Sequence, residues 1–200
     1  KGTCVGHPIP GVEIKIIEIS DQPILKWQDV TESGTNIVGE IAVKAEWATR
    51  TYFNRQDLTQ LAKIEDGNSF WHRMGDLGRL DEKNRLWFYG RKNQRVVTEF
   101  ETLYTIPCEA IFNQHPDVKR SALVGTGYKT KPVIIIEPVE RIKSQAARQK
   151  FTAELLERGA KSSLTQSITK VLFHEEFPVD VRHNAKIFRE KLSLWAENQK

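Results

Sequence analysis

The stretch that decides the fold runs from Trp71 to Arg91 and reads WHRMGDLGRLDEKNRLWFYGR. Two glycines flank the carboxylate of Asp76, and glycine lets a backbone pass close to a ligand. Residues 79–80 and 86–89 are typical of two strands joined by the turn residues 81–84. Because a carboxylate accepts two hydrogen bonds at once, Asp76 suits a vicinal diol such as a ribose, and Arg91 could donate to the same sugar or to a phosphate. The spacing alone also fits a plain hairpin with a capping aspartate and a surface arginine.

The residues before this stretch predict a β-rich region. Apolar and polar side chains alternate at residues 12–16 and 39–44, as they do in half-buried strands, and turn residues precede both segments. A short helix is expected from Asp57 to Ile64, with Asp57 as its N-cap.

The residues after this stretch predict helices mixed with short apolar strands. One helix is expected to open at Pro107, with Glu109 in its first turn, and a second is expected to end at Gly159. Further elements are expected at residues 121–124, 133–136 and 171–173 as strands and at 188–197 as a closing helix. The predicted fold class is therefore α+β, with a β-rich region at residues 1–90 and a small α+β domain at residues 91–200.

Composition bounds the classes of function. The chain has 200 residues, of which 39% are hydrophobic and 28% charged, as in ordinary globular proteins. Its net charge of +4 is uneven: residues 1–90 hold 11 basic and 13 acidic side chains, whereas residues 91–200 hold 19 and 13. A basic second half favours an anionic ligand. Nucleic acid is not expected, because neither a basic tail nor a recognition motif is present.

Cysteine, histidine and apolar runs carry little further signal. Cys4 and Cys108 lie far apart and are expected to be small buried residues, which fits a reducing cytoplasm. The five histidines show no metal-ligand spacing, so no metal site is expected in this chain. No apolar run approaches the ~20 residues that cross a bilayer. The first residue is Lys1 and not Met, so a targeting segment upstream stays open.

Several motifs in order resemble the closing third of the adenylate-forming superfamily, which includes acyl- and aryl-CoA synthetases, peptide-synthetase adenylation domains and luciferases. The motifs are Gly39-Glu40-Ile41, Tyr52 with Thr59, Gly75-Asp76-Leu77-Gly78, Gly90-Arg91 and the late Lys186. The resemblance covers essentially the whole chain and is most specific from Trp71 to Arg91. It implies that residues 1–90 are the end of the large AMP-binding domain and that residues 91–200 are the small mobile domain.

The resemblance also implies a role for each matched residue. Asp76 would bind both ribose hydroxyls of ATP, and Arg91 would contact the same ribose. Lys186 would be the catalytic lysine of the adenylation step, with His183 as the histidine closest to it. Asn93 would be the hinge about which the small domain rotates, although the family usually has Asp or Lys there. Asn tolerates unusual φ and ψ values and so can serve.

A second departure points to one branch of the superfamily. Residues 96–106 lack the short glycine-containing loop that often serves the second half-reaction. This segment, with residues 107–113 and 182–191, is similar to the olefin-biosynthesis branch of β-lactone synthetases, long described as fatty-acid CoA ligases. Those enzymes adenylate a β-hydroxy acid, whose own hydroxyl then displaces AMP. The use of CoA is therefore open.

The implied function is ATP-dependent activation of a fatty or β-hydroxy fatty acid. ATP is the expected nucleotide, with Mg²⁺ held mainly by residues that precede residue 1. The family's phosphate loop and acyl pocket would also precede it, so this chain alone is expected to be inactive. An acyl-CoA ligase is the first alternative, and a non-catalytic nucleotide- or partner-binding module is the second. A cytoplasmic location and association with enzymes of the same pathway are expected.

Overall fold

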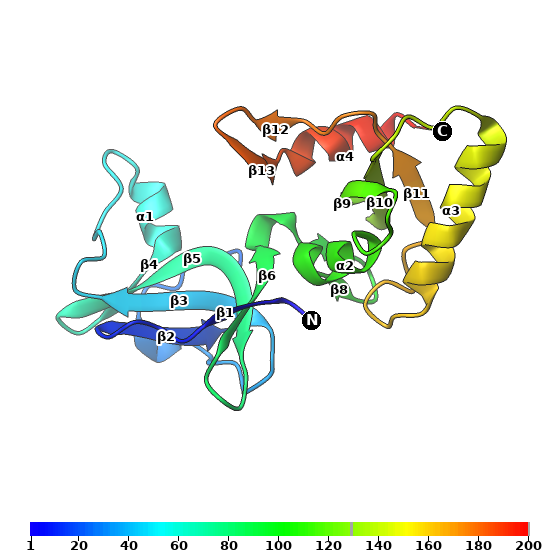
Figure 1. Ribbon diagram of the computed structural model, residues 1–200. Coiled ribbons are helices and arrows are strands. Elements are labelled where there is room, and N and C mark those ends of the chain that lie inside the picture. The colour runs from blue at the N-terminus through cyan, green and yellow to red at the C-terminus, as the bar shows by residue number, and fades with distance from the viewer. Residues whose placement is uncertain (129, 200) are drawn as a thin grey trace. The chain divides into compact units, whose positions relative to one another are not determined.

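The computed structural model describes residues 1–128 and 130–199, and in residues 183–185 it describes the backbone only. The chain separates into two compact units, Lys1–Asn93 and Gln94–Lys200, whose elements are labelled in Figure 1. The first unit is mostly antiparallel sheet, and the second combines helices with short sheets. The predicted α+β class is confirmed.

The first unit is a six-stranded antiparallel sheet with strand order β1-β6-β5-β3-β2, in which β4 also pairs with β5. Its elements are β1 (Thr3–Gly6), β2 (Val12–Ile17), a 3₁₀ turn (Trp27–Asp29), β3 (Gly39–Ala45), α1 (Gln56–Ala62), β4 (Lys63–Asp66), β5 (Ser69–Leu80) and β6 (Leu86–Arg91). Its core contains Ile17, Ala42, Ile64 and Trp71, and Trp71 stacks on Trp27 at 4.4 Å between ring centroids.

Two local predictions in the first unit need correction. The strand expected at residues 79–80 is the end of a single strand, β5, that already begins at Ser69. Gly75 allows β5 to continue as one strand of this length, because it takes a φ of +66° and accommodates a register shift against β3. Helix α1 has Arg55 at its N-cap, not Asp57; Asp57 lies in the first turn and pairs with Arg55 at 3.0 Å.

The second unit is built around the three-stranded sheet β11-β10-β9. Strands β9 (Val118–Thr126) and β10 (Lys131–Pro138) are antiparallel, and β11 (Lys170–Phe173) runs parallel to β10 after the crossover helix α3 (Gln145–Ala160). The remaining elements are a 3₁₀ turn (Lys92–Gln94) that spans the junction of the units, β7 (Val96–Val97), β8 (Thr102–Leu103), α2 (Thr105–Phe112), β12 (Val179–Asp180), β13 (His183–Ile187) and α4 (Arg189–Glu197).

Strand β10 supplies side chains to two hydrophobic cores because successive residues of a strand face opposite sides. Ile134 and Ile136 pack with residues of α2 and α3, including Phe112. Val133 and Ile135 pack on the other face with residues of α4, including Leu192. The helices α2 and α3 therefore cover one face of the sheet and α4 covers the other (Figure 1).

Helix boundaries in the second unit differ from those expected. Helix α2 begins at Thr105, two residues before Pro107, and Glu109 lies beyond its first turn as a buried residue. Helix α3 continues through Gly159, which was expected to end it. A Cβ on Gly159 would meet Phe112 Cζ at 3.0 Å, so close helix packing accounts for this glycine.

Two further observations concern exposure. Cys108 is buried as expected, whereas Cys4 is exposed, because it lies on the edge strand β1. Among the described residues, none of the helices has the length and apolar character needed to cross a membrane.

Candidate functional site

Asp76 and Arg91 face each other across neighbouring strands. They are directly paired in the register of β5 and β6, and Arg91 Nη1 lies 3.0 Å from Asp76 Oδ1. The Asp76 side chain is 18% exposed and the Arg91 side chain 58%, so the pair is open on the arginine side. Gly78 lets the strands approach, because a Cβ there would meet the Trp87 carbonyl oxygen at 2.7 Å. This glycine is therefore explained by strand packing and not by a ligand.

The Asp76 carboxyl is held in an unfavourable environment. Burial raises the pKa of Asp76, the charge of Glu40 adds to the rise, and Arg91 opposes it. Asp76 Oδ1 also makes no well-aligned hydrogen bond within the described chain, even though the Arg91 guanidinium is close. A buried carboxylate oxygen without a hydrogen-bond donor is an acceptor available to a ligand hydroxyl.

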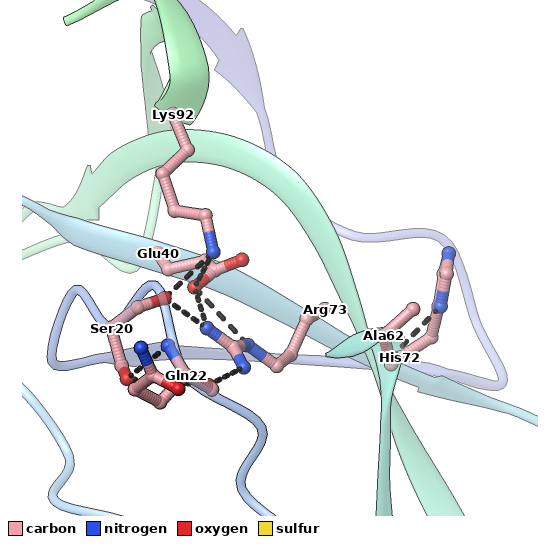
Figure 2. Close-up of polar contacts among 7 residues, drawn as sticks. All are labelled: Ser20, Gln22, Glu40, Ala62, His72, Arg73 and Lys92. Carbon is pink, nitrogen blue, oxygen red and sulfur yellow. Dashed lines mark hydrogen bonds and ion pairs between the residues drawn. The ribbon is translucent and has the colours of Figure 1, made fainter. Parts of the chain in front are cut away.

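Beside this pair lies a buried cluster of three charged side chains, drawn in Figure 2. Glu40 Oε2 accepts hydrogen bonds from Arg73 Nη2 at 2.6 Å and Nε at 3.1 Å, and from Lys92 Nζ at 3.1 Å. The side chains of Glu40 and Arg73 are each 1% exposed. Arg73 also donates to the carbonyl oxygens of Ser20 and Gln22, and Lys92 donates to that of Ser20 at 2.8 Å.

This Glu40–Arg73–Lys92 cluster joins β3 and β5 to the residue that follows β6, and β5 and β6 carry the Asp76–Arg91 pair. Arg73 is three residues before Asp76 on β5, and Lys92 directly follows Arg91. No pattern in the sequence assigns a role to Arg73 or Lys92. One feature of the sequence did point to a buried charge, because Glu40 is an acidic residue in a predicted strand and the residues beside it are not charged. His72, next to Arg73, points to the other side of the strand and lies 3.3 Å from the Ala62 carbonyl oxygen (Figure 2).

Asn93 is the last residue of the first unit. Its side chain is exposed and makes no hydrogen bond within the part of the chain that the structure describes. It lies at the centre of the 3₁₀ turn Lys92–Gln94. The neighbouring residue Gln94 is the first residue of the second unit, and its Oε1 accepts from Arg189 Nη1 at 3.2 Å.

Lys186 lies in the second unit, on strand β13, which pairs with β12 in a two-stranded sheet. Its side chain is exposed, whereas the next residue, Ile187, is 7% exposed and packs in the α4 core. Helix α4 begins three residues after the lysine, close to the start at residue 188 expected for the closing helix. The side chain of His183, expected near Lys186, lies outside the described residues.

A buried ion pair holds the segment that follows Lys186. Arg189 Nη2 lies 2.7 Å from Glu109 Oε2 and 2.9 Å from Oε1, and the Leu123 amide donates to Glu109 Oε1 at 2.9 Å. The exposed fractions of the two side chains are 14% for Arg189 and 8% for Glu109. Glu109 was expected in the first turn of its helix; it lies beyond that turn, where it joins α2 to α4.

Neither a metal-binding group nor a cavity adds residues to the site in the part of the chain that the structure describes. Within the described residues, His, Cys, Asp and Glu side chains form no group of three or more that could hold a metal ion. A hollow of about 1090 Å³ lies beside Tyr52, Lys63 and Phe70 in the first unit, and it is not lined by Asp76 or Arg91.

Sequence comparisons relate the chain to known enzymes, although no family model matches it. It is 45% identical over 206 aligned residues to an olefin beta-lactone synthetase of Xanthomonas campestris pv. campestris, covering 100% of this chain and 37% of that protein. It is 42% identical to an olefin beta-lactone synthetase of Stenotrophomonas maltophilia, covering 98% of this chain and 36% of that protein. The chain thus spans little more than a third of the length of these relatives.

Solved structures share the fold. ATP-bound MatB from Rhodopseudomonas palustris superposes with a TM-score of 0.76 at 19% identity, covering 98% of this chain and 36% of that one. An o-succinylbenzoate CoA synthetase (MenE) from Bacillus subtilis, in complex with its acyl-adenylate intermediate, gives 0.74 at 22% identity, covering 94% and 35%. Sequence relatives and fold agree, and the chain matches the C-terminal portion of the adenylate-forming superfamily.

Proposed function

We propose that this chain is the C-terminal portion of an ATP-dependent enzyme that activates a carboxylic acid as its acyl-adenylate, with a β-hydroxy fatty acid converted to a β-lactone. The observation that carries the proposal is the match, along the whole chain, to two proteins named olefin beta-lactone synthetase. Structural neighbours that hold ATP or an acyl-adenylate support the nucleotide. In this proposal, residues 1–90 end the large domain and residues 91–200 form the small mobile one.

The Asp76–Arg91 pair is the proposed ribose site. Asp76 Oδ1 makes no well-aligned hydrogen bond within the described chain, and a ribose diol would supply hydroxyl donors to the two carboxylate oxygens. Such donors favour the charged carboxylate and would lower the pKa of Asp76 that burial has raised. Arg91, which is more exposed, would donate to the same sugar. Together they would hold the ribose so that the α-phosphate is placed for in-line attack.

Lys186 is the proposed catalytic residue. In the first step a carboxylate oxygen of the acid attacks the α-phosphorus of ATP and pyrophosphate leaves. Negative charge builds up on the phosphoryl oxygens, and an ammonium group placed between carboxylate and phosphate stabilises it. In the second step the β-hydroxyl oxygen attacks the acyl carbon, the bond to AMP breaks and the hydroxyl proton is released. Mg²⁺ bound with ATP would neutralise charge on the β- and γ-phosphates.

A second candidate function is acyl-CoA formation. Relatives named as CoA ligases favour it, for example a malonate–CoA ligase of Arabidopsis thaliana that is 28% identical over 98% of this chain. The two functions differ in the second nucleophile. Three expectations from the sequence stay predictions: a non-catalytic binding module as the second alternative, a cytoplasmic location, and association with pathway enzymes.

The test uses the longer enzyme that would contain this chain. Lys186→Ala should lower the rate of acid-dependent pyrophosphate release by roughly 10²–10³, while ATP still binds. Lys143→Ala, which removes an exposed ammonium group of the same unit, is the matched control and should keep the rate. An unchanged rate in Lys186→Ala would make that residue a solvated surface cation.

The product distinguishes the two candidate functions. A β-hydroxy acid with ATP and no CoA should give a β-lactone and AMP, and added CoA should not change the product. A matched acid without the β-hydroxyl should stop at the acyl-adenylate. Acyl-CoA as the product, formed only when CoA is present, would assign the chain to a CoA ligase. The 200-residue chain alone should release no pyrophosphate.

A further inference from the structure

We propose that Lys92 and Gln94 are positioning residues that confine the pivot between the two units to the single residue Asn93, and that Arg189 links this pivot to the strand that carries Lys186. The inference rests on the proposed function in one respect, namely that the units rotate during the reaction. The anchors themselves are properties of each unit taken separately.

The first anchor lies immediately before Asn93. Lys92 Nζ donates to Glu40 Oε2 at 3.1 Å and to the Ser20 carbonyl oxygen at 2.8 Å, and its side chain is 17% exposed. Glu40 is in turn held by Arg73. Moving the Lys92 side chain away would leave the buried Glu40 carboxylate with fewer partners, and removing a partner from a buried ion pair is strongly destabilising. The backbone is therefore fixed to the sheet as far as Lys92.

The second anchor lies immediately after Asn93. Gln94 Oε1 accepts from Arg189 Nη1 at 3.2 Å, and the same guanidinium binds Glu109 through two of its nitrogens. Because Arg189 is 14% exposed and Glu109 8%, this contact is largely shielded from water. Arg189 opens α4 and is three residues beyond Lys186. A movement of Gln94 would therefore be passed to the segment that carries the lysine.

Asn93 is the residue left between these anchors. Its side chain is exposed, and within the described chain it has no hydrogen bond to lose. Its φ and ψ can change without breaking either anchor, and asparagine enters the left-handed region more readily than most residues. A pivot of one residue matters for precision, because an error of about 1 Å in placing a catalytic group can cost on the order of 10² in rate.

The test compares variants that remove an anchor with variants matched in chemistry. Lys92→Met keeps the aliphatic stem and removes the charge, and Lys92→Arg restores a cation. Lys83→Met, in the exposed turn between β5 and β6, is the control. For the second anchor, Gln94→Leu is compared with Gln114→Leu, an exposed glutamine of the same unit.

The first readout is amide hydrogen exchange of residues 90–96 in the 200-residue chain. Lys92→Met and Gln94→Leu should each speed exchange roughly tenfold, as expected for loss of a hydrogen-bonded contact, and Lys92→Arg should recover most of the protection. Exchange equal to that of the control variants would overturn the anchors. This readout does not depend on any enzymatic activity.

The second readout is single-turnover kinetics of the longer enzyme. Both anchor variants should slow adenylation about tenfold or more and leave the KM for ATP within about twofold, because they misplace Lys186 without touching the ribose pair. A raised KM at unchanged kcat would show that Lys92 serves ATP binding instead, and so would overturn its positioning role. If the unmodified enzyme forms no adenylate, the proposed function fails while the exchange comparison still decides the anchors.

Discussion

Replacing Glu40 by glutamine tests the buried cluster directly. The substitution keeps the size of the side chain and one acceptor oxygen, but leaves Arg73, which is 1% exposed, and Lys92 without a counter-charge. Removing one partner of a buried ion pair costs about 3–5 kcal/mol. We expect the low end, about 3 kcal/mol, because the carbonyl oxygens of Ser20 and Gln22 still accept from Arg73.

The matched control is Glu32→Gln. Glu32 pairs with Lys15 at 2.9 Å, a separation similar to those in the cluster, but these side chains are 45% and 42% exposed. An exposed pair is worth less than about 1 kcal/mol. The two variants therefore differ in the burial of the carboxylate and in the second cation that pairs with Glu40.

The assay is urea unfolding of the chain followed by tryptophan fluorescence. Of the five tryptophans, only Trp195 lies outside the first unit, so the signal reports mainly on the sheet. If the loss for Glu40→Gln is within about 0.5 kcal/mol of that for Glu32→Gln, the reasoning from burial is wrong. The triple variant Glu40→Leu with Arg73→Met and Lys92→Met should recover much of the loss, because none of the three charges of the cluster is then left without its partner.

Three further predictions follow from side-chain environments. Asp76→Asn should raise the Tm at neutral pH, because burial raises the pKa of Asp76 and the charged form is unfavourable in the fold. Thermal melts should show this gain in Tm disappearing as pH falls through that raised pKa. An equal gain at low pH would contradict the prediction. Asp81→Asn should lower the Tm at neutral pH. Burial favours the neutral acid, but hydrogen bonds from Trp87 and Arg85 lower the pKa of Asp81. The stability that Asp81 contributes is therefore present above the ordinary aspartate pKa and is lost as pH falls. Glu82→Gln, next to it and exposed, is the control and should lack this loss. A thiol reagent should modify Cys4 in the folded chain and Cys108 only after unfolding, since burial raises the pKa of Cys108 to about 12; two fast-reacting thiols would refute this.

Local features of the sequence predicted the turn between the two strands that carry Asp76 and Arg91. The turn at residues 81–84 sets the pairing of residues 78–80 with residues 86–88. An irregularity between Leu77 and Gly78 then shifts the register by one residue, so that Asp76 faces Arg91. The resemblance added the interpretation of the pair and of Lys186. Those assignments stay predictions, since geometry alone does not show a bound nucleotide.

The Glu40–Arg73–Lys92 cluster was beyond the reach of sequence patterns. Glu40 and Arg73 are 33 positions apart in the chain, and they meet only because β3 lies beside β5 in the sheet. Periodicity shows which face a side chain takes but not which strand is its neighbour. The start of α2 was missed for a different reason. Proline is tolerated anywhere in the first turn, where amides have no helical partner, so Pro107 marked the turn without marking its first residue.

Strand β10 has a consequence for the cooperativity of the second unit. Its residues alternate between the α2–α3 core and the α4 core, so neither core can lose its packing while the strand stays in place for the other. The two cores should therefore melt in a single calorimetric transition, with a van't Hoff enthalpy that accounts for both. Helix α4 begins with Arg189, so the segment that follows Lys186 shares the stability of the whole unit. A substitution on the α3 side, such as Leu155→Ala, would then loosen the lysine-bearing side as well, on the opposite face of the sheet.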